Sequence, residues 1–258
     1  IVVIDECHHL PAASFARFAE AIQPRYLLGL TATPERTDGA PIARFFHQRP
    51  DGTPAVELRL WDALDQQLLA PFEYYATQDE CDFADVPWGN PRRETVELSA
   101  ILTGNEIRAR LVMVAIERYV ASIGSMKALA FCVDIAHAEF MAEYLNAHGL
   151  PSVAVTSNTP RLEREIAPRK LAAGDLKIIC TCDLYNEGVD IPEANTLLFL
   201  RPTQSPVVFQ QQLGRGLRLS DQKDNCLVLD FVGRVRAGFR FDRLYQAITG
   251  LSRRQFMA

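Results

Sequence analysis

The sequence predicts an α/β protein in which parallel β-sheets are covered by helices on both faces. Short apolar runs rich in β-branched residues alternate with stretches of helical periodicity, the order expected of strand–helix–strand units. The runs are almost continuously apolar, as in strands that are buried on both faces. They predict strands at Ile1–Ile4, Tyr26–Leu30, Ala128–Val133, Ser152–Val155, Lys177–Cys182, Thr196–Leu200 and Cys226–Phe231.

Helices are predicted between these strands from capping residues and apolar spacing. Asp134 and Ser205 are N-cap candidates, and Ser205 is followed by proline at the first helical position. A longer helix is predicted from Asn105 to Val120, with Ile107, Leu111, Ala115 and Val120 facing inward. Pro168 is expected to kink or split a further helix.

The length of 258 residues fits one large domain or two modest ones. Asp79 to Pro91 is acidic, contains Pro and Gly and lacks periodicity, which indicates an irregular connector. We therefore predict a boundary near Leu68–Pro71, with one part at 1–70 and the other at 71–258, whose first residues (71–94) are the connector. The first part has only two convincing strands, so we expect a piece of one domain followed by a complete second domain.

The composition excludes several classes of protein. Hydrophobic residues make up 48% and charged residues 23% of the chain, which is typical of a globular protein and not of disorder, collagen or a coiled coil. We find no apolar run long enough to span a bilayer and no signal peptide. The net charge is −5, but residues 201–258 carry +6 and the remainder −11, which is compatible with a polyanion partner at the C-terminal end.

The six cysteines lie mostly within apolar runs and form no paired C-x-x-C motif. This argues against zinc and predicts buried free thiols in a reducing compartment, so we expect a cytoplasmic protein. His47, His137 and His148 are expected at the surface or at helix ends.

Two adjacent acids end the first predicted strand. Ile1–Ile4 leads into Asp5-Glu6-Cys7-His8, and side chains at the carboxyl end of a parallel strand reach the ligand crevice. One acid there can hold Mg²⁺, normally through water, while its neighbour orients or deprotonates an attacking water. A solvated strand end is the plain alternative. A metal-dependent hydrolase built on Cys7, His8 and His9 is disfavoured, because adjacent histidines point to opposite sides of a strand.

Two further motifs follow predicted strands. The second strand runs into hydroxyls at Thr31 and Thr33, before a proline. The segment Asn186 to Pro192 contains Gly188 beside an acid, and a glycine in such a position can approach a ribose or phosphate closely. An ordinary turn explains either segment equally well when it is considered alone.

Arginines and glycines alternate in a fourth motif, Gln211 to Arg218. Arg215 and Arg218 are three residues apart, which predicts that they share one helical face. Planar, permanently charged guanidinium groups suit phosphate, and an arginine at a transferring phosphoryl group stabilises the charge that develops there. A basic, solvated helix end is the alternative explanation.

Taken together, the four motifs resemble the superfamily 2 helicases of the DEAD/DEAH type, and within them the type III restriction subunit and excision-repair helicase group. The resemblance covers nearly the whole chain, and the joint match in this order is highly specific. The matching segments are Asp5–His8 (motif II, the Walker B box), Thr31–Thr33 (motif III), Phe131-Cys132 (motif IV), Thr156–Arg161 (motif IVa), Thr181–Asp190 (motif V) and Gln211–Arg218 (motif VI).

The resemblance implies RecA-like lobes of the P-loop NTPase fold, with a partial first lobe at 1–70 and a complete second lobe at 71–258. ATP with Mg²⁺ would lie between the lobes and a nucleic-acid strand across their tops. The implied activity is that of an ATP-dependent helicase or translocase that contacts the backbone of DNA, in preference to RNA, without reading its sequence. Restriction or repair subunits are the implied partners, and no membrane contact is expected.

The same resemblance implies a role for individual residues. Asp5 would hold Mg²⁺ through water, and Glu6 would be the catalytic base. The implied catalytic set is Asp5, Glu6, His8, Gln211, Arg215 and Arg218. The implied nucleotide contacts are Gly188, Asp190 and Gly214, the interlobe coupling residues are Thr31 and Thr33, and the nucleic-acid contacts are Thr156, Thr181 and Arg201.

The sequence departs from the family pattern at one motif. It contains no G-x-x-x-x-G-K-[ST] segment, the loop that cradles the nucleotide phosphates. We expect that loop upstream of residue 1, so residues 1–258 alone are expected neither to bind ATP tightly nor to hydrolyse it. A catalytically inactive nucleic-acid-binding remnant and the motor subunit of a restriction complex are the alternative functions.

Overall fold

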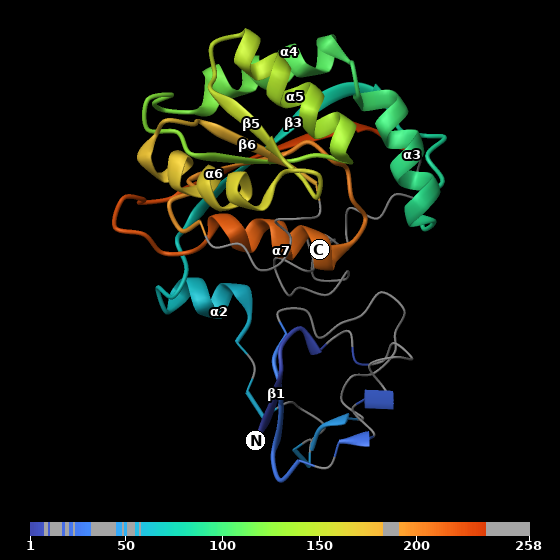
Figure 1. Ribbon diagram of the computed structural model, residues 1–258, viewed down its shortest axis with the longest axis vertical. Helices are drawn as coiled ribbons and strands as arrows, with labels where there is room; N and C mark the ends of the chain where they lie inside the picture. The colour runs from blue at the N-terminus through green and yellow to red at the C-terminus, as the bar shows by residue number, and fades with distance from the viewer. Residues whose placement is uncertain are drawn as a thin grey trace, which may run out of the picture.

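The computed structural model describes residues 1–7, 10, 17–18, 21–22, 24–31, 45–47, 49–50, 55–56, 58–182 and 191–235. These residues form a two-stranded sheet and a six-stranded sheet, and every named strand pair is parallel (Figure 1). In the small sheet, β1 (Val2–Ile4) pairs with β2 (Leu27–Gly29). The predicted α/β class is confirmed.

The larger sheet has the strand order β3-β8-β7-β4-β6-β5. Its strands are β3 (Phe72–Asp82), β4 (Ala128–Phe131), β5 (Ser152–Val155), β6 (Ile178–Thr181), β7 (Thr196–Phe199) and β8 (Cys226–Arg234). The helices are α2 (Leu60–Asp65), α3 (Pro91–Leu102), α4 (Glu106–Tyr119), α5 (Ile135–Ala147), α6 (Arg161–Ala173) and α7 (Pro206–Gly216). Each of the predicted strands overlaps an observed strand.

The predicted irregular segment Asp79 to Pro91 is irregular from 83 to 90, but most of the wider 71–94 connector is regular. Residues 72–82 form β3, which pairs with β8 from Phe72 opposite Cys226 onward. Helix α3 then begins at Pro91, where the side chain of Asn90 accepts a hydrogen bond from the Arg93 amide. β3 lies at an edge of the sheet and is mostly half-buried or exposed. Its polar residues therefore gave no apolar run by which the strand could be recognised.

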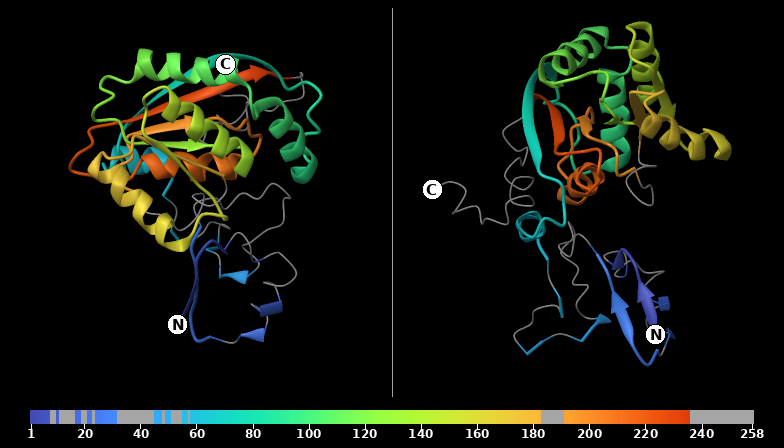
Figure 2. Two further views of the ribbon diagram at one scale, coloured as in Figure 1. Left: turned by 45° about the horizontal axis from the view of Figure 1, so that its top comes forward. Right: turned by 90° about the vertical axis from the view of Figure 1, so that its left-hand side faces the viewer.

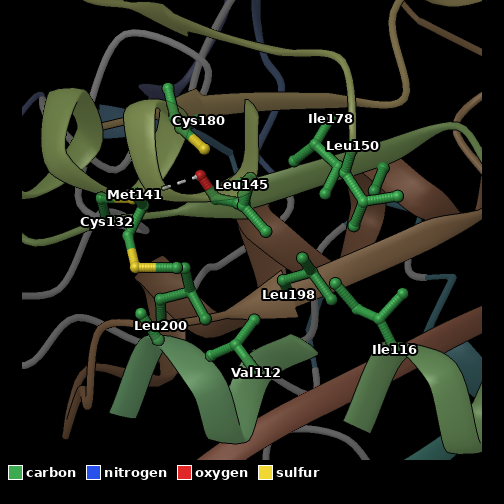
Figure 3. Packing of buried hydrophobic residues seen from close by; sticks show 14 of the residues in the cluster. Val112, Ile116, Cys132, Met141, Leu145, Leu150, Ile178, Cys180, Leu198 and Leu200 are labelled. Carbon is green, nitrogen blue, oxygen red and sulfur yellow. Dashed lines mark hydrogen bonds between the residues drawn. The ribbon is translucent and has the colours of Figure 1, made fainter. Parts of the chain in front are cut away.

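The core of the larger sheet has two apolar layers, one on each face. Helices α4 and α5 cover one face, and α6 and α7 cover the other, which is nearer the N-terminal segment in Figure 1. Figure 3 shows Val112 and Ile116 of α4 and Met141 of α5 over strand residues such as Leu198. Fully burying an aliphatic side chain of this size contributes about 1.5–3 kcal/mol. The views in Figure 2 show β1 and β2 apart from this layered body.

One helix prediction needs correction. Of the residues predicted to face inward on α4, Ala115 is buried, but Ile107 is 80% exposed and Arg108 occupies an inward position beside Ala109. Helix α6 contains Pro168 and continues past it to Ala173. His137 lies at a helix end, in the first turn of α5, where it is fully buried and its Nδ1 accepts a hydrogen bond from the Val133 amide at 3.2 Å.

Other local predictions are confirmed. Asp134 and Ser205 cap α5 and α7 through the amides of His137 and Val208. His148 lies at the end of α5, and all six cysteines are free, four of them buried. Within the described ranges, no helix is long and apolar enough to cross a membrane.

Candidate functional site

The carboxyl end of β1 brings the two adjacent acids beside the residue that follows β2. The Leu30 amide donates to the Ile4 carbonyl and the Cys7 amide donates to the Leu30 carbonyl, both at 2.9 Å. These two bonds extend the parallel pairing past the ends of the strands, so Thr31 follows directly beside the turn that contains Asp5 and Glu6. The sequence segments of motifs II and III therefore meet at one edge of the small sheet.

The backbone at Glu6 has an unusual conformation. Its φ is +48°, in the left-handed region that costs a non-glycine residue about 1 kcal/mol or more. The Glu6 amide donates to Oδ1 of Asp5 at 3.0 Å, which orients the exposed Asp5 carboxylate. The turn thus separates an exposed acid from a half-buried one, in the arrangement expected for a metal-orienting acid and a neighbouring base.

The chemistry around these acids suits a hydrated Mg²⁺ better than a zinc ion. Asp5 supplies an exposed carboxylate, and Mg²⁺ is commonly held by one or two carboxylates with several waters and substrate phosphates. In the part of the chain that the structure describes, no group of three His, Cys, Asp or Glu side chains gathers for a metal ion. Burial, with the nearby Glu6 and Asp5 carboxylates, raises the pKa of the Cys7 thiol, which disfavours a thiolate ligand there.

Helix α7 carries most of the fourth motif. Gln211 and Arg215 lie one turn apart, both half-buried, and the intervening Gly214 is exposed. The helix ends at Gly216, with Leu217 as its C-cap, so Arg218 lies beyond the helix. The prediction that the two arginines share one helical face is therefore wrong, because the helix stops between them.

Gly216 fixes where the arginine segment lies against the sheet. A Cβ at this residue would lie 2.4 Å from Sγ of Cys226 and 2.8 Å from Cδ1 of Leu197, closer than side-chain carbons approach. The Ala70 amide donates to the Leu217 carbonyl at 2.8 Å. The end of α7 is thus held against two strands and against the segment that precedes β3.

The three predicted nucleic-acid contacts follow neighbouring strands of the larger sheet. Thr181 ends β6, Thr156 follows β5 and Arg201 lies two residues beyond β7. Val155 is opposite Thr181 in the β5–β6 pairing, so the two threonines lie near each other at the carboxyl edge. Arg201 is two strands away, beyond β4 in the strand order.

The two threonines are almost inaccessible at this edge. Thr156 and Thr181 are 2% and 1% exposed. The Thr156 hydroxyl accepts from the Asn158 amide at 3.2 Å, and its own amide donates to Oγ1 of Thr159 at 3.0 Å. Thr156 therefore shapes the turn of 156–159. Arg201 is more accessible, and its Nη2 lies 4.0 Å from Oε1 of Glu94.

Four predicted site residues lie outside the described residues. They are His8, Thr33, Gly188 and Asp190. Of the nucleotide and coupling predictions, the structure therefore locates Gly214 and Thr31 only.

Buried charges near the larger sheet were missed by the sequence interpretation. Arg108 is 3% exposed and pairs with Asp79, while its Nη2 donates to the Leu200 carbonyl at 3.0 Å. Asp230 accepts from the Tyr74 hydroxyl, and burial raises its pKa to about 6. Asp230 could have been recognised from the sequence, because it is an acid within an apolar run that predicts a buried strand. Acids are rarely buried without a partner, so a partner such as Tyr74 was to be expected.

Comparisons with known proteins match both regions of the chain that carry these motifs. Residues 1–36 match the family "Type III restriction enzyme, res subunit", and residues 112–220 match the "Helicase conserved C-terminal domain". Both matches support the resemblance to the superfamily 2 helicases. The two matched regions are the ones that carry Asp5-Glu6 and the Gln211–Arg218 motif.

Individual relatives cover almost all of the chain. The Saccharomyces cerevisiae protein IRC3, whose name describes an ATP-dependent helicase, is 28% identical over 92% of this chain and 34% of its own length. The DNA 3'-5' translocase XPB2 of Sulfurisphaera tokodaii is 26% identical over 94% of this chain and 61% of its own length. The chain thus spans 34–49% of the length of the first three curated relatives that it matches.

A solved structure gives the same fold. The HsdR-subunit fragment of a type I restriction enzyme from Vibrio vulnificus YJ016 superposes with a TM-score of 0.70 at 23% identity, covering 97% of this chain and 46% of that chain. This likeness supports the RecA-like architecture of the parallel sheet and its helices.

Proposed function

We propose that this chain is the core of an ATP-dependent nucleic-acid helicase or translocase. The observation that carries the proposal is the junction of motifs II and III, where Asp5 and Glu6 lie beside Thr31 through the Cys7–Leu30 and Leu30–Ile4 hydrogen bonds. One carboxylate that can orient a metal ion, a second that can act as a general base and a hydroxyl lie at one edge of the small sheet. This set of groups suits nucleotide hydrolysis that is linked to movement.

The residues have distinct roles in this proposal. Asp5 holds Mg²⁺ through water, and the metal supplies charge neutralisation at the phosphates when bound. Glu6 accepts a proton from the attacking water, and its half-buried position favours a base over a solvated charge. Gln211, Gly214, Arg215 and Arg218 approach the nucleotide from the other lobe, where a guanidinium stabilises the charge of the transferring phosphoryl group.

Movement is coupled to the nucleotide through residues 1–70 and 71–258, which we propose as the partial first lobe and the second lobe. Thr31 and Thr33, with His8, link the nucleotide to the interface between them. Gly188 and Asp190 contact the nucleotide from the second lobe. The Ala70–Leu217 hydrogen bond attaches the end of α7 to the last residue of the first part, where Leu60 and Leu69 also pack against the core of the larger sheet.

We propose DNA as the preferred substrate, bound through its backbone independently of sequence. The name of the translocase relative supports DNA over RNA. Arg201 is the least buried of the three candidates for a phosphate contact, with its side chain 15% exposed. Thr156 and Thr181 are buried, so in this proposal they hold the backbone at the ends of β5 and β6 in place beside the nucleic acid. A direct contact between either hydroxyl and a phosphate would require these strand ends to open locally.

The motor subunit of a restriction complex is a second candidate. The match of residues 1–36 to the type III restriction subunit favours it. In that case the same ATP-dependent movement would serve a partner subunit that carries out the cleavage.

A nucleic-acid panel tests the proposal. ATP turnover by the full-length gene product is measured with Mg²⁺ and single-stranded DNA, duplex DNA or RNA, and a displacement assay follows movement. We expect at least tenfold stimulation by DNA and a smaller effect of RNA. An ATP turnover rate that no nucleic acid changes would contradict the proposal. Nucleic-acid binding without any ATP turnover would instead favour a catalytically inactive nucleic-acid-binding protein.

A further inference from the structure

A buried lysine joins two segments that carry the predicted motifs. Lys223 follows α7 in a turn closed by pairing with Ser220, and it is 9% exposed. Its Nζ donates to the carbonyl oxygens of Pro192 at 2.7 Å, Ala194 at 3.0 Å and Gly216 at 2.9 Å. An ammonium group has three donors, so these contacts use all of them.

Each of the three carbonyls belongs to a segment beside the candidate site. Gly216 ends α7, where the carbonyls lack intrahelical partners and carry the negative end of the helix dipole. Pro192 and Ala194 lie directly after residues 183–190, the segment that contains Gly188 and Asp190 in the sequence. One nitrogen therefore fixes the 191–195 segment against the end of the motif VI helix.

Other contacts hold both segments close to this nitrogen. Asn195 accepts from the Lys127 amide at 2.9 Å and donates to the Ser125 carbonyl at 2.9 Å, which attaches the 191–195 segment to the chain before β4. On the other side, Gly216 is packed against Cys226. The Lys223 ammonium is thus a bridge between two anchored pieces of backbone.

Among the described residues, the Lys223 ammonium group is surrounded by main-chain carbonyls and not by a carboxylate partner. Burial is the largest influence on the pKa of Lys223 and lowers it. The nearby Cys226 and Glu193 act to raise this pKa, and Arg218 acts to lower it. The three described hydrogen bonds go to main-chain carbonyls and none to a carboxylate. Geometry, more than charge neutralisation, is therefore what the side chain supplies.

We propose that Lys223 is a positioning residue that couples the 191–195 segment, which leads into β7, to the end of α7 carrying Gly214 and Arg215. This inference rests on the proposed ATP-dependent function. A shift of either segment on nucleic-acid binding displaces the other, because three carbonyls converge on one nitrogen. Lys223 touches no reacting group, and it acts on the stimulation of turnover by nucleic acid.

The experiment compares Lys223→Met with the unaltered full-length gene product. ATP turnover is measured with saturating DNA and without it, and the ratio of the two rates is the readout. We expect the ratio to fall at least fivefold, while DNA affinity without nucleotide stays within twofold. Lys223→Arg keeps the cation and should retain more of the ratio. Lys170→Met, on the exposed side of α6, is the matched control and should leave the ratio unchanged.

Two outcomes overturn the inference. A variant that is merely less stable loses both rates in proportion, so an unchanged ratio in Lys223→Met contradicts coupling. Hydrogen exchange of the same proteins is the second readout, and it does not depend on turnover. We expect exchange in the 191–195 and 213–217 backbones to rise together, and a rise in one alone or in neither contradicts the bridge. If the unaltered protein shows no stimulated turnover, the proposed function fails, and hydrogen exchange alone decides the bridge.

Discussion

Two buried cations lie at opposite edges of the six-stranded sheet and are satisfied in different ways. Arg108, at the carboxyl edge, pairs with the Asp79 carboxylate and donates to the Leu200 carbonyl. Lys223, at the amino edge, donates to three main-chain carbonyls. Removing one member of the charge pair would therefore leave a buried charge uncompensated, whereas removing the lysine would leave only neutral carbonyls without their donor.

The largest effect is expected at Arg108. Arg108→Met leaves the Asp79 carboxylate buried at 2% exposure without its partner, which should lower the free energy of unfolding by about 3–5 kcal/mol. Urea unfolding measures this loss. Arg110→Met, two residues along α4 and exposed, is the control and should change little. A loss below about 1 kcal/mol at Arg108 would remove the contrast between the two edges.

The acid of the carboxyl edge should make stability depend on pH. The folded pKa of Asp230 is raised to about 6 by burial, against an ordinary value near 3.8. The folded state therefore holds the proton more tightly, and this stabilisation is complete below about pH 4 and lost as the pH rises through 6.

Asp230→Asn separates that contribution from all others. The free energy of unfolding of the variant, relative to the unaltered protein, should increase by about 2 kcal/mol between pH 4.5 and pH 7. Denaturant unfolding at both pH values measures it. A relative stability that does not change with pH would show that Asp230 is not protonated preferentially in the folded state.

Loss of the amino-edge cation should cost less stability than loss of the carboxyl-edge cation. Lys223→Met removes three hydrogen bonds to carbonyls but leaves no buried carboxylate behind, so we expect a loss of about 2–3 kcal/mol by urea unfolding. A cost equal to that of Arg108→Met would mean that the lysine, too, is primarily a determinant of the fold.

The smallest effect is expected for an exposed ion pair. Arg161 and Glu165 are one turn apart on α6, with side chains 87% and 55% exposed. Solvent screens this pair, so Arg161→Ala should leave the urea midpoint unchanged within error. A clear shift of the urea midpoint would show that the exposed Arg161 contributes to stability as the buried Arg108 and Lys223 do.

Much of the fold was predictable because its central strands are apolar on both faces. The runs at 128–133, 177–182 and 196–200 lie in the middle of the sheet, and each became a strand. β3 was missed because an edge strand needs no continuous apolar run. Ile107 was misassigned because a buried, paired Arg108 replaced an apolar residue on the inward face of α4.

The candidate site was predictable where chemistry and position in the sequence coincide. Asp5 and Glu6 follow a strand, and the parallel pairing of β1 with β2 explains why they meet Thr31. The end of α7 between Arg215 and Arg218 could not be read from their spacing, because tertiary packing at Gly216 sets it. Lys223 gave no signal, since its three partners are main-chain carbonyls.

The most direct test of the account is single-turnover ATP hydrolysis by Glu6→Gln in the full-length gene product with saturating DNA. We predict a loss of at least 100-fold in the hydrolysis rate with ATP binding retained, because the amide cannot accept the proton of the attacking water. Glu117→Gln, an exposed neutralisation on α4, should hydrolyse ATP at the unaltered rate. A Glu6→Gln variant that hydrolyses ATP normally would contradict the assignment of the Asp5-Glu6 turn as the catalytic centre.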